Sequence, residues 1–440
     1  MPKRRKFFLN SLLALVAIAP IVLYAIVPGP GYTGAPGDNS TGCIKSGCHT
    51  GTPNSGPGSV KITASGGMTY VPGQTQQISV TITDSTEKKY GFQLTARVDS
   101  NPKTTEAGLL VRDSAGYTEV QCANGSSAPA SGCTASTGGS LEWINHTVAG
   151  YNASNSTPGI FTYTFSWTPP ATDSGTVTLY AAGEAVTGAD VVTGTESYLT
   201  SLQLSPVAPP AITSVVSDAS FASPVASGSW AAIFGSNLAP AGDSRLWGQS
   251  DIAGAELPVN LDGTSVTVNG KAATVEFISP GQVNVQFPDD TALGPVPVVV
   301  TTAGGGSASF TAMYAQFAPG LFAAAAPYLV AQHADSSYVT PASPAKPGEI
   351  VILWGTGFGP ADPPVPSGQM FSGANALANP VTATVGGQPA PVLFAGVVGA
   401  GLVQINVQVP TGIGNGDAPV LLSVGGVSTQ TAGNLISIQP

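Results

Sequence analysis

Short runs in which polar and apolar residues alternate constrain the fold of this chain more than any other feature. Residues 77–83 (QISVTIT) and 160–167 (IFTYTFSW) place apolar side chains at every second position, which is typical of strands with one buried face. Turn-forming residues recur between such runs, and the 440 residues include 55 glycines and 38 prolines. After residue 30 no amphipathic helix of useful length is indicated. The sequence therefore predicts an all-β protein built of immunoglobulin-like β-sandwiches.

Composition and charge exclude several classes of protein. Charged residues make up 9% of the chain, whereas roughly 25% is usual, so an ordinary cytoplasmic enzyme is not expected. The 42% of apolar residues is enough to bury a core, which argues against disorder. The net charge of −10 would repel phosphate backbones, so we expect no nucleic acid among the partners.

The N-terminus has the pattern of an export signal. The basic run Lys3-Arg4-Arg5-Lys6 precedes the uncharged, mostly apolar residues 7–27, which is the order of charge and hydrophobicity in secretory signals. This run is also just long enough to span a bilayer, which takes about 20 residues. Residues 1–30 are therefore predicted to be a signal peptide or a membrane anchor. In either case the rest of the chain is exported, to the outer face of the membrane, the periplasm, the cell surface or the medium.

The remainder divides into three predicted sandwiches. The first covers residues 31–205, and the proline-rich residues 206–211 (PVAPPA) form a linker. Beyond it the chain repeats itself: residues 228–240 align without gaps on residues 348–360, and residues 282–288 (QVNVQFP) match residues 404–410 (QINVQVP). Tandem copies of one sandwich are thus predicted at residues 212–316 and 348–440. The Ala/Pro-rich residues 317–347 are expected to form a covering connector.

One motif in the first domain points to chemistry. Cys43 and Cys48 are separated by four residues, and His49 follows directly. Attachment of haem c requires two thiols that reach the vinyl groups and an adjacent imidazole that binds the iron. The usual form is C-x-x-C-H, and a four-residue spacer is a variant of it. The alternative is a small disulfide loop between Cys43 and Cys48 with a histidine beside it by accident.

Residues around this motif carry a family resemblance. The segments at residues 32–38 (YTGAPGD), 90–96 (YGFQLTA), 142–147 (EWINHT) and 178–188 (TLYAAGEAVTG) are similar to the bacterial choice-of-anchor V domain, which is related to the Reeler domain. The resemblance covers about residues 31–205. It implies that His49 and His146 form a pair, with His146 as the second axial ligand of a haem iron. Glu184 departs from the family pattern, which has Asn at that place.

The C-terminal half resembles another module. Residues 347–359 (PGEIVILWGTGFG) are similar to the opening strand of IPT/TIG immunoglobulin-like domains, and residues 211–440 resemble a tandem C-terminal module of bacterial secreted proteins. This resemblance implies a fold and says little about function.

The neighbouring residues in the sequence indicate a role or an exposure for four further side chains. Cys122 and Cys133 bracket a loop of small and polar residues, so in an oxidising compartment we expect a disulfide there. Met68, in a glycine-rich turn, is an alternative sixth ligand of the iron. His333 is expected to be exposed to solvent. No motif of a hydrolase or transferase is present, so catalysis is not predicted.

Two functions are consistent with the sequence. The first is an exported haem c protein in which Cys43 and Cys48 form thioethers and His49 and His146 bind iron, with electron transfer or redox sensing as its role and an unknown redox partner. In that function the IPT/TIG-like domains are a stalk or docking surface. The second is a haem-free surface protein that adheres to a cell-surface, matrix or glycan component.

Overall fold

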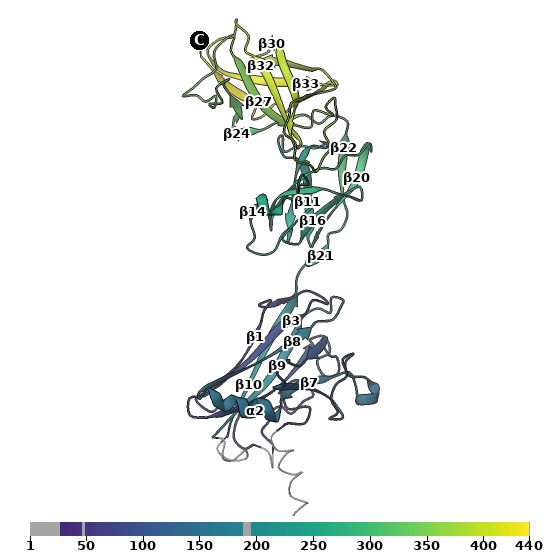
Figure 1. Cartoon of the computed structure of the whole chain (residues 1–440), viewed down its shortest axis with the longest axis vertical. Helices are drawn as coiled ribbons and strands as arrows, with labels where there is room; N and C mark the ends of the chain where they lie inside the picture. Colours follow the sequence, from purple (N-terminus) through teal and green to yellow (C-terminus); the bar gives the residue numbers. More distant parts are fainter. Residues whose placement is uncertain (1–26, 46–48, 188–194, 440) are drawn as a thin grey trace, which may run out of the picture. The chain divides into compact units, whose positions relative to one another are not determined.

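The computed structural model describes residues 27–45, 49–187 and 195–439 of the chain. The chain divides into two compact units, Met1–Val207 and Ala208–Pro440 (Figure 1). In the described part, no helix is both long and apolar enough to cross a membrane. The predicted signal or anchor falls almost entirely outside these residues and stays a prediction.

The N-terminal unit is a sandwich of two sheets, as predicted. One sheet has the strand order β1-β3-β8-β5 and the other β2-β10-β9-β4-β7-β6. The first sheet consists of β1 (Ser59–Ala64), β3 (Gln76–Thr83), β8 (Ile160–Thr168) and β5 (Leu109–Val111). The second consists of β2 (Thr69–Tyr70), β10 (Thr195–Pro206), β9 (Val177–Val186), β4 (Lys89–Val98), β7 (Glu142–His146) and β6 (Thr118–Cys122). The described residues of this unit also include the short helical segments η1 (Ala135–Thr137), α2 (Val148–Ala153) and η2 (Ser154–Ser156).

The alternating runs form strands for the reason that the sequence indicates. In β8, Tyr163, Phe165 and Trp167 are buried, while the threonines and the serine between them lie on the outer face. These aromatic rings pack against β4, where Phe92 lies 4.6 Å from Tyr163 between ring centroids. Burial of such side chains contributes about 1.5–3 kcal/mol each. The core of the sandwich therefore lies between β3 and β8 on one side and β4 and β9 on the other.

The first sandwich of the C-terminal unit also has two sheets. Their strand orders are β11-β13-β19-β18-β14 and β12-β22-β20-β16-β15. The first sheet consists of β11 (Ala211–Ser217), β13 (Trp230–Ser236), β19 (Gln282–Gln286), β18 (Thr274–Ser279) and β14 (Arg245–Leu246), with η3 (Gln249–Asp251) after it. The second consists of β12 (Val225–Ala226), β22 (Phe310–Ala315), β20 (Gly294–Thr302), β16 (Thr264–Val268) and β15 (Asn260–Leu261), with β17 (Lys271–Ala272) and β21 (Gly305–Gly306) at its margin.

The second sandwich of this unit begins earlier than the sequence predicts. Residues 317–347, expected to be a connector, supply the short strands β23 (Gly320–Leu321), β24 (Ala323–Ala325), β25 (Tyr328–Leu329) and β26 (Ala331–Gln332) to its two sheets. Leu321, Leu329 and Ala345 from this segment lie in its core. Each of these strands is only two or three residues long and lies in an Ala/Pro-rich stretch. No alternation of polar and apolar residues therefore marks them in the sequence. The other strands are β27 (Ile350–Thr356), β28 (Asn375–Ala376), β29 (Val381–Val385), β30 (Gln388–Ala390), β31 (Val392–Gly399), β32 (Leu402–Gln408), β33 (Gly416–Val424), β34 (Val427–Ser428) and β35 (Leu435–Ile438).

The two sandwiches of the C-terminal unit are joined by hydrogen bonds. Trp230 donates its backbone N–H to Thr356 Oγ1 at 3.0 Å and its indole N–H to the carbonyl oxygen of Ala400 at 2.7 Å. Asp289 and Ser367 exchange two hydrogen bonds of 2.9 Å. A groove of about 590 Å³ lies at this joint, lined among others by Ser229, Asp289, Leu293, Gly359, Val365 and Gly401.

The disulfide between Cys122 and Cys133 is present in the structure, at the end of β6. Replacing both cysteines by serine should lower the free energy of unfolding of the N-terminal unit by about 2–3 kcal/mol, because the unfolded chain regains the freedom of the closed loop. Denaturant unfolding of wild type and double variant, followed by tryptophan fluorescence, measures the difference. An unchanged midpoint would show that the loop is held by its other contacts alone.

His333 is not exposed as predicted, because it follows β26 within the second sandwich. Its side chain is 14% exposed and its Nδ1 lies 2.5 Å from Glu349 Oε1. The hydrogen bond to Glu349 is the main cause that raises the pKa of His333. Contacts of this kind are invisible in the sequence because His333, after β26, and Glu349, before β27, lie 16 residues apart and meet only in the folded sandwich.

The His333–Glu349 pair should make the stability of this sandwich depend on pH. A raised folded-state pKa means that the stabilisation is complete below the unfolded pKa of about 6.5 and is lost as pH rises through the folded-state pKa. The melting temperature of wild type should therefore exceed that of His333→Gln by more at about pH 5.5 than at about pH 9. Thermal scans of both proteins test this, and equal gaps at both pH values would refute it.

Candidate functional site

The candidate site lies on the face of strand β4 that points away from the hydrophobic core. Residues Phe92, Leu94 and Ala96 point into the core and are buried there. The residues between them form a row of polar groups and one glycine on the opposite face. This row consists of Gly91, Gln93, Thr95 and Arg97. Gln93, Thr95 and Arg97 are all fully buried, so this face is covered by another part of the chain.

The cover is the segment that leads into the cysteine motif. Gln93 accepts a 2.7 Å hydrogen bond from the backbone N–H of Tyr32 and donates one of 2.8 Å to the carbonyl oxygen of Gly29. Gly42 has a positive φ of 61° and would meet Leu199 if it carried a Cβ, so the turn before Cys43 requires glycine. Cys43 itself is buried, with its Sγ 3.8 Å from the Tyr32 carbonyl oxygen.

His49 lies against a buried carboxyl group on β9. Its Nδ1 is 3.8 Å from Glu184 Oε2, and its side chain is 16% exposed. Glu184 also accepts a 2.5 Å hydrogen bond from Ser197 Oγ on β10, and its carboxyl group interacts with the Cys43 side chain. Cys43, His49 and Glu184 therefore form one cluster over strands β9 and β10.

His146, at the end of β7, approaches the same cluster from the other side. Its Nδ1 lies 2.9 Å from the backbone nitrogen and 3.0 Å from the carbonyl oxygen of Phe92, so the ring takes the place of a backbone partner beside β4. The backbone N–H of Phe92 donates to Nδ1, so Nδ1 is the unprotonated nitrogen of the ring in this arrangement. Iron ligation through Nε2 would require the other tautomer, in which Nδ1 donates to the Phe92 carbonyl oxygen. The ring needs the open space at Gly91, where a Cβ would lie 2.6 Å from His146 Cε1.

Burial keeps the titratable groups of this cluster neutral. It raises the pKa of Glu184 to about 8. Burial and the nearby His146 lower the pKa of His49. The contact between His49 and Glu184 is therefore one between uncharged groups near pH 7, not an ion pair. An uncharged imidazole is the form that binds metals.

The structure brings together most of the residues that the sequence singled out. Cys43, His49 and His146 meet at one place, although His146 is distant in the sequence. Cys48 lies outside the described residues, so its role stays a prediction. Met68, the alternative ligand, has a side chain that is 67% exposed, which favours His146 over it.

One observation in particular makes His49 and His146 candidate ligands of a haem iron. His49 Nδ1 and Glu184 Oε2 are buried and have no hydrogen-bond partner among the described residues, and a ligating histidine usually has its second nitrogen beside a carboxylate or carbonyl group. Among these residues no group of three or more His, Cys, Asp or Glu could hold a metal ion. A porphyrin needs only two axial ligands from the protein, and His49 and His146 are the two candidates.

Sequence reasoning left the role of Glu184 open and missed Ser197 and Arg97 altogether. The available signal was the alternation in β4, since residues 91, 93, 95 and 97 are polar or glycine opposite an apolar face. A polar face with a buried arginine indicates that another segment must cover it.

The space at Gly91 can be tested by Gly91→Ala. The added methyl group would overlap the His146 ring, so the variant should lose about 1–3 kcal/mol of unfolding free energy through overpacking. Denaturant unfolding measures the loss. Gly29→Ala, whose Cβ would meet nothing within 4 Å, is the control and should be neutral. Equal stability of both variants would show that the ring can move away without cost.

Comparison with known families identifies one part of the chain. Residues 210–317 match the family model described as IPT/TIG domain. This confirms the resemblance for the first sandwich of the C-terminal unit. The repeat between residues 228–240 and 348–360 links the second sandwich to the same IPT/TIG pattern. No curated protein matches the chain.

Several solved structures match the chain at low sequence identity. The reeler domain of human F-spondin is 17% identical, with 37% of this chain and 99% of that chain covered and a TM-score of 0.23. The C-terminal domain of the Streptococcus agalactiae AgI/II polypeptide BspA is 9% identical, with 87% and 100% covered and a TM-score of 0.20. The BSP domain of a biofilm-associated protein is 10% identical, with 89% and 68% covered and a TM-score of 0.27. Of the two resemblances that the sequence predicted, IPT/TIG is the one that a family model matches.

Proposed function

We propose that this protein is an exported surface protein whose N-terminal sandwich binds one haem c, for electron transfer or redox sensing, and whose IPT/TIG-type unit is a stalk or docking module. The observation that carries the haem is the meeting of His49, His146 and Cys43 in one buried cluster. The IPT/TIG match supports the modular surface part of the proposal. The haem part is supported by the donor set alone.

The residues of the cluster have separate roles in this proposal. Cys43 and Cys48 would add their S–H groups across the two vinyl double bonds, which needs no external oxidant or reductant. His49 and His146 would be the imidazole ligands of the iron. Glu184 would orient His49 by facing its second ring nitrogen. Bound haem supplies an iron that is reversibly oxidised and reduced, and two imidazole ligands favour a lower reduction potential than a His/Met pair.

Covalent colour tests this function. The full chain with its own N-terminus should be expressed in a bacterium that has haem c attachment machinery, and its visible absorbance should be measured after acid-acetone extraction. We expect a Soret band that survives extraction and disappears in the Cys43→Ser/Cys48→Ser variant. Cys122→Ser/Cys133→Ser is the matched control, because it removes two cysteines that form a disulfide away from the cluster, and its colour should remain.

His146→Ala separates attachment from ligation. Because the thioethers do not involve His146, this variant should keep covalent colour while its absorption spectrum and reduction potential change. A colourless wild-type protein from the competent host would contradict the haem proposal.

A haem-free surface protein that adheres to other components is the second candidate. The groove of about 590 Å³ at the joint of the C-terminal unit favours it, since concave sites of this size bind ligands. In this function Cys43 and Cys48 would be a disulfide, and the IPT/TIG-type unit would be the binding part. A colourless wild-type protein would support this candidate if the peptide that contains Cys43 and Cys48 is two hydrogens lighter than its reduced form. That mass difference is the one expected for a disulfide between the two cysteines.

A further inference from the structure

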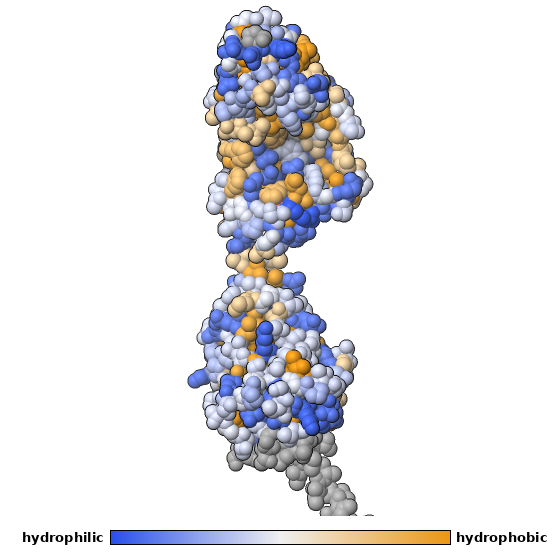
Figure 2. All heavy atoms as spheres, turned by 90° about the vertical axis from the view of Figure 1, so that its left-hand side faces the viewer, coloured by the Kyte–Doolittle hydropathy of each residue, from blue (hydrophilic) through white to orange (hydrophobic). Residues whose placement is uncertain are grey.

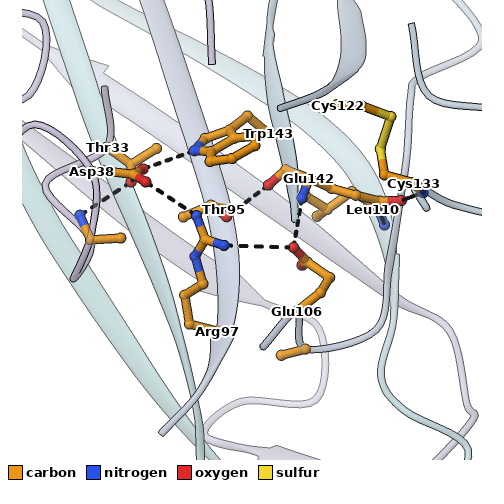
Figure 3. A network of polar contacts seen from close by, with 12 residues as sticks. Thr33, Asp38, Thr95, Arg97, Glu106, Leu110, Cys122, Cys133, Glu142 and Trp143 are labelled. Carbon is orange, nitrogen blue, oxygen red and sulfur yellow. Dashed lines mark hydrogen bonds and ion pairs between the residues drawn. A yellow bond between two sulfur atoms is a disulfide. The ribbon is translucent and has the colours of Figure 1, made fainter. Parts of the chain in front are cut away.

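The most unusual charge in the N-terminal unit is the guanidinium group of Arg97. Its side chain is fully buried, and it lies between two carboxyl groups, as Figure 3 shows. Nη2 is 3.2 Å from Asp38 Oδ1, and Nη1 is 4.0 Å from Glu106 Oε2. The guanidinium also lies over the ring of Trp143, 4.9 Å from its centroid. A buried cation requires a compensating charge, because an unpaired one is very costly.

Asp38 supplies that charge. Asp38 is the nearer of the two carboxyl groups, at 3.2 Å against 4.0 Å for Glu106, and burial raises the pKa of Glu106 well above its usual range. The carboxyl group of Asp38 is 4% exposed. Its Oδ2 accepts hydrogen bonds of 2.8 Å from Trp143 Nε1 and 2.7 Å from Thr33 Oγ1. Asp38 is thus held by β4 through Arg97 and by β7 through Trp143.

The segment fixed in this way is the one that carries the candidate ligands. Asn39 donates its backbone N–H to the Gly31 carbonyl oxygen at 2.9 Å, and its side-chain amide donates to Gly42 at 2.7 Å and to Ile44 at 3.1 Å. These bonds close the turn that contains Cys43. Ile44 then forms a bridge with His49. The two strands that hold Asp38 also form the other half of the site, with Gly91 on β4 and His146 at the end of β7.

We propose that Asp38 is a positioning residue for this site: its ion pair with Arg97 and its bond to Trp143 fix residues 39–45 over β4 and β7, and so set His49, which forms a bridge with Ile44, relative to His146. Only the identity of the group that His49 binds depends on the proposed function. The placement of the segment itself is independent of haem.

The test is Asp38→Asn in the full chain. This variant keeps the shape of the side chain but removes the charge of the carboxyl group nearest to Arg97. Amide hydrogen exchange at Asn39, Gly42 and Ile44 should become at least about tenfold faster, because the segment opens locally. Exchange in β3 and β8 should stay unchanged. Asp99→Asn is the control, since Asp99 bonds Thr178 and Gln203 on β9 and β10 instead. Unchanged exchange at residues 39–44 in folded Asp38→Asn would overturn the proposal.

A second variant covers the case in which Asp38→Asn does not fold. Asp38→Asn combined with Arg97→Gln removes both buried charges. If the ion pair fixes the segment, residues 39–44 should still exchange at least about tenfold faster in this folded protein; wild-type protection there would overturn the proposal.

If the wild type carries haem, its spectrum gives a further readout. The visible spectrum of folded Asp38→Asn should then lose the low-spin signature of two axial imidazoles while covalent haem is retained, which a loss of stability alone would not produce. A retained low-spin signature would contradict the positioning of His49. Faster exchange in a colourless protein would support the positioning by Asp38 and refute the haem.

Discussion

The burial of one guanidinium group determines how the N-terminal unit is assembled. Arg97 stands on a strand whose opposite face is in the core, so it cannot reach solvent without breaking the sheet. Its charge therefore requires a carboxylate from another segment, and Asp38 supplies it. Asp38 belongs to the segment from Gly29 to Ile44 that covers this face of β4. Without this pairing, the guanidinium group would lose its nearest carboxylate, while Gln93 and Thr95 on the same row would keep their own partners. The surface of the unit is unremarkable by comparison, with hydrophobic residues scattered over the face shown in Figure 2.

Much of the architecture follows from local sequence. Alternation in residues 77–83 and 160–167 identifies β3 and β8, because each side chain on a half-buried strand reports which face it occupies. The internal repeat identifies the tandem sandwiches of the C-terminal unit. Cys122 and Cys133 are close enough in sequence for their pairing to be expected. Each of these signals is contained within a short stretch or compares one stretch with another.

Other features depend on contacts between distant strands and leave little trace in the sequence. Glu184 and Ser197 meet because β9 and β10 pair in one register, and no spacing rule predicts that His49 lies beside them. His333 was expected to be exposed for the same reason, since its partner Glu349 is on a later segment. The strands of residues 320–332 are too short to show a period of two. Burial of polar groups was the least predictable property, because it depends on which segment covers which face.

The hydrogen bonds of Trp230 make the C-terminal unit stiffer than two sandwiches joined only by a flexible linker would be. A single indole side chain ties the first sandwich to the carbonyl oxygen of Ala400 in the second, and the exchange of bonds between Asp289 and Ser367 adds a second attachment point. Further hydrogen bonds from Leu257 to Gly368, from Met370 to Ala255 and from Gly368 to Gln286 add to these. Several attachment points resist hinge bending in a way that one cannot. Pulling on this unit from its ends would therefore load these bonds together, and the resisting force would build up until the joint ruptures and then fall.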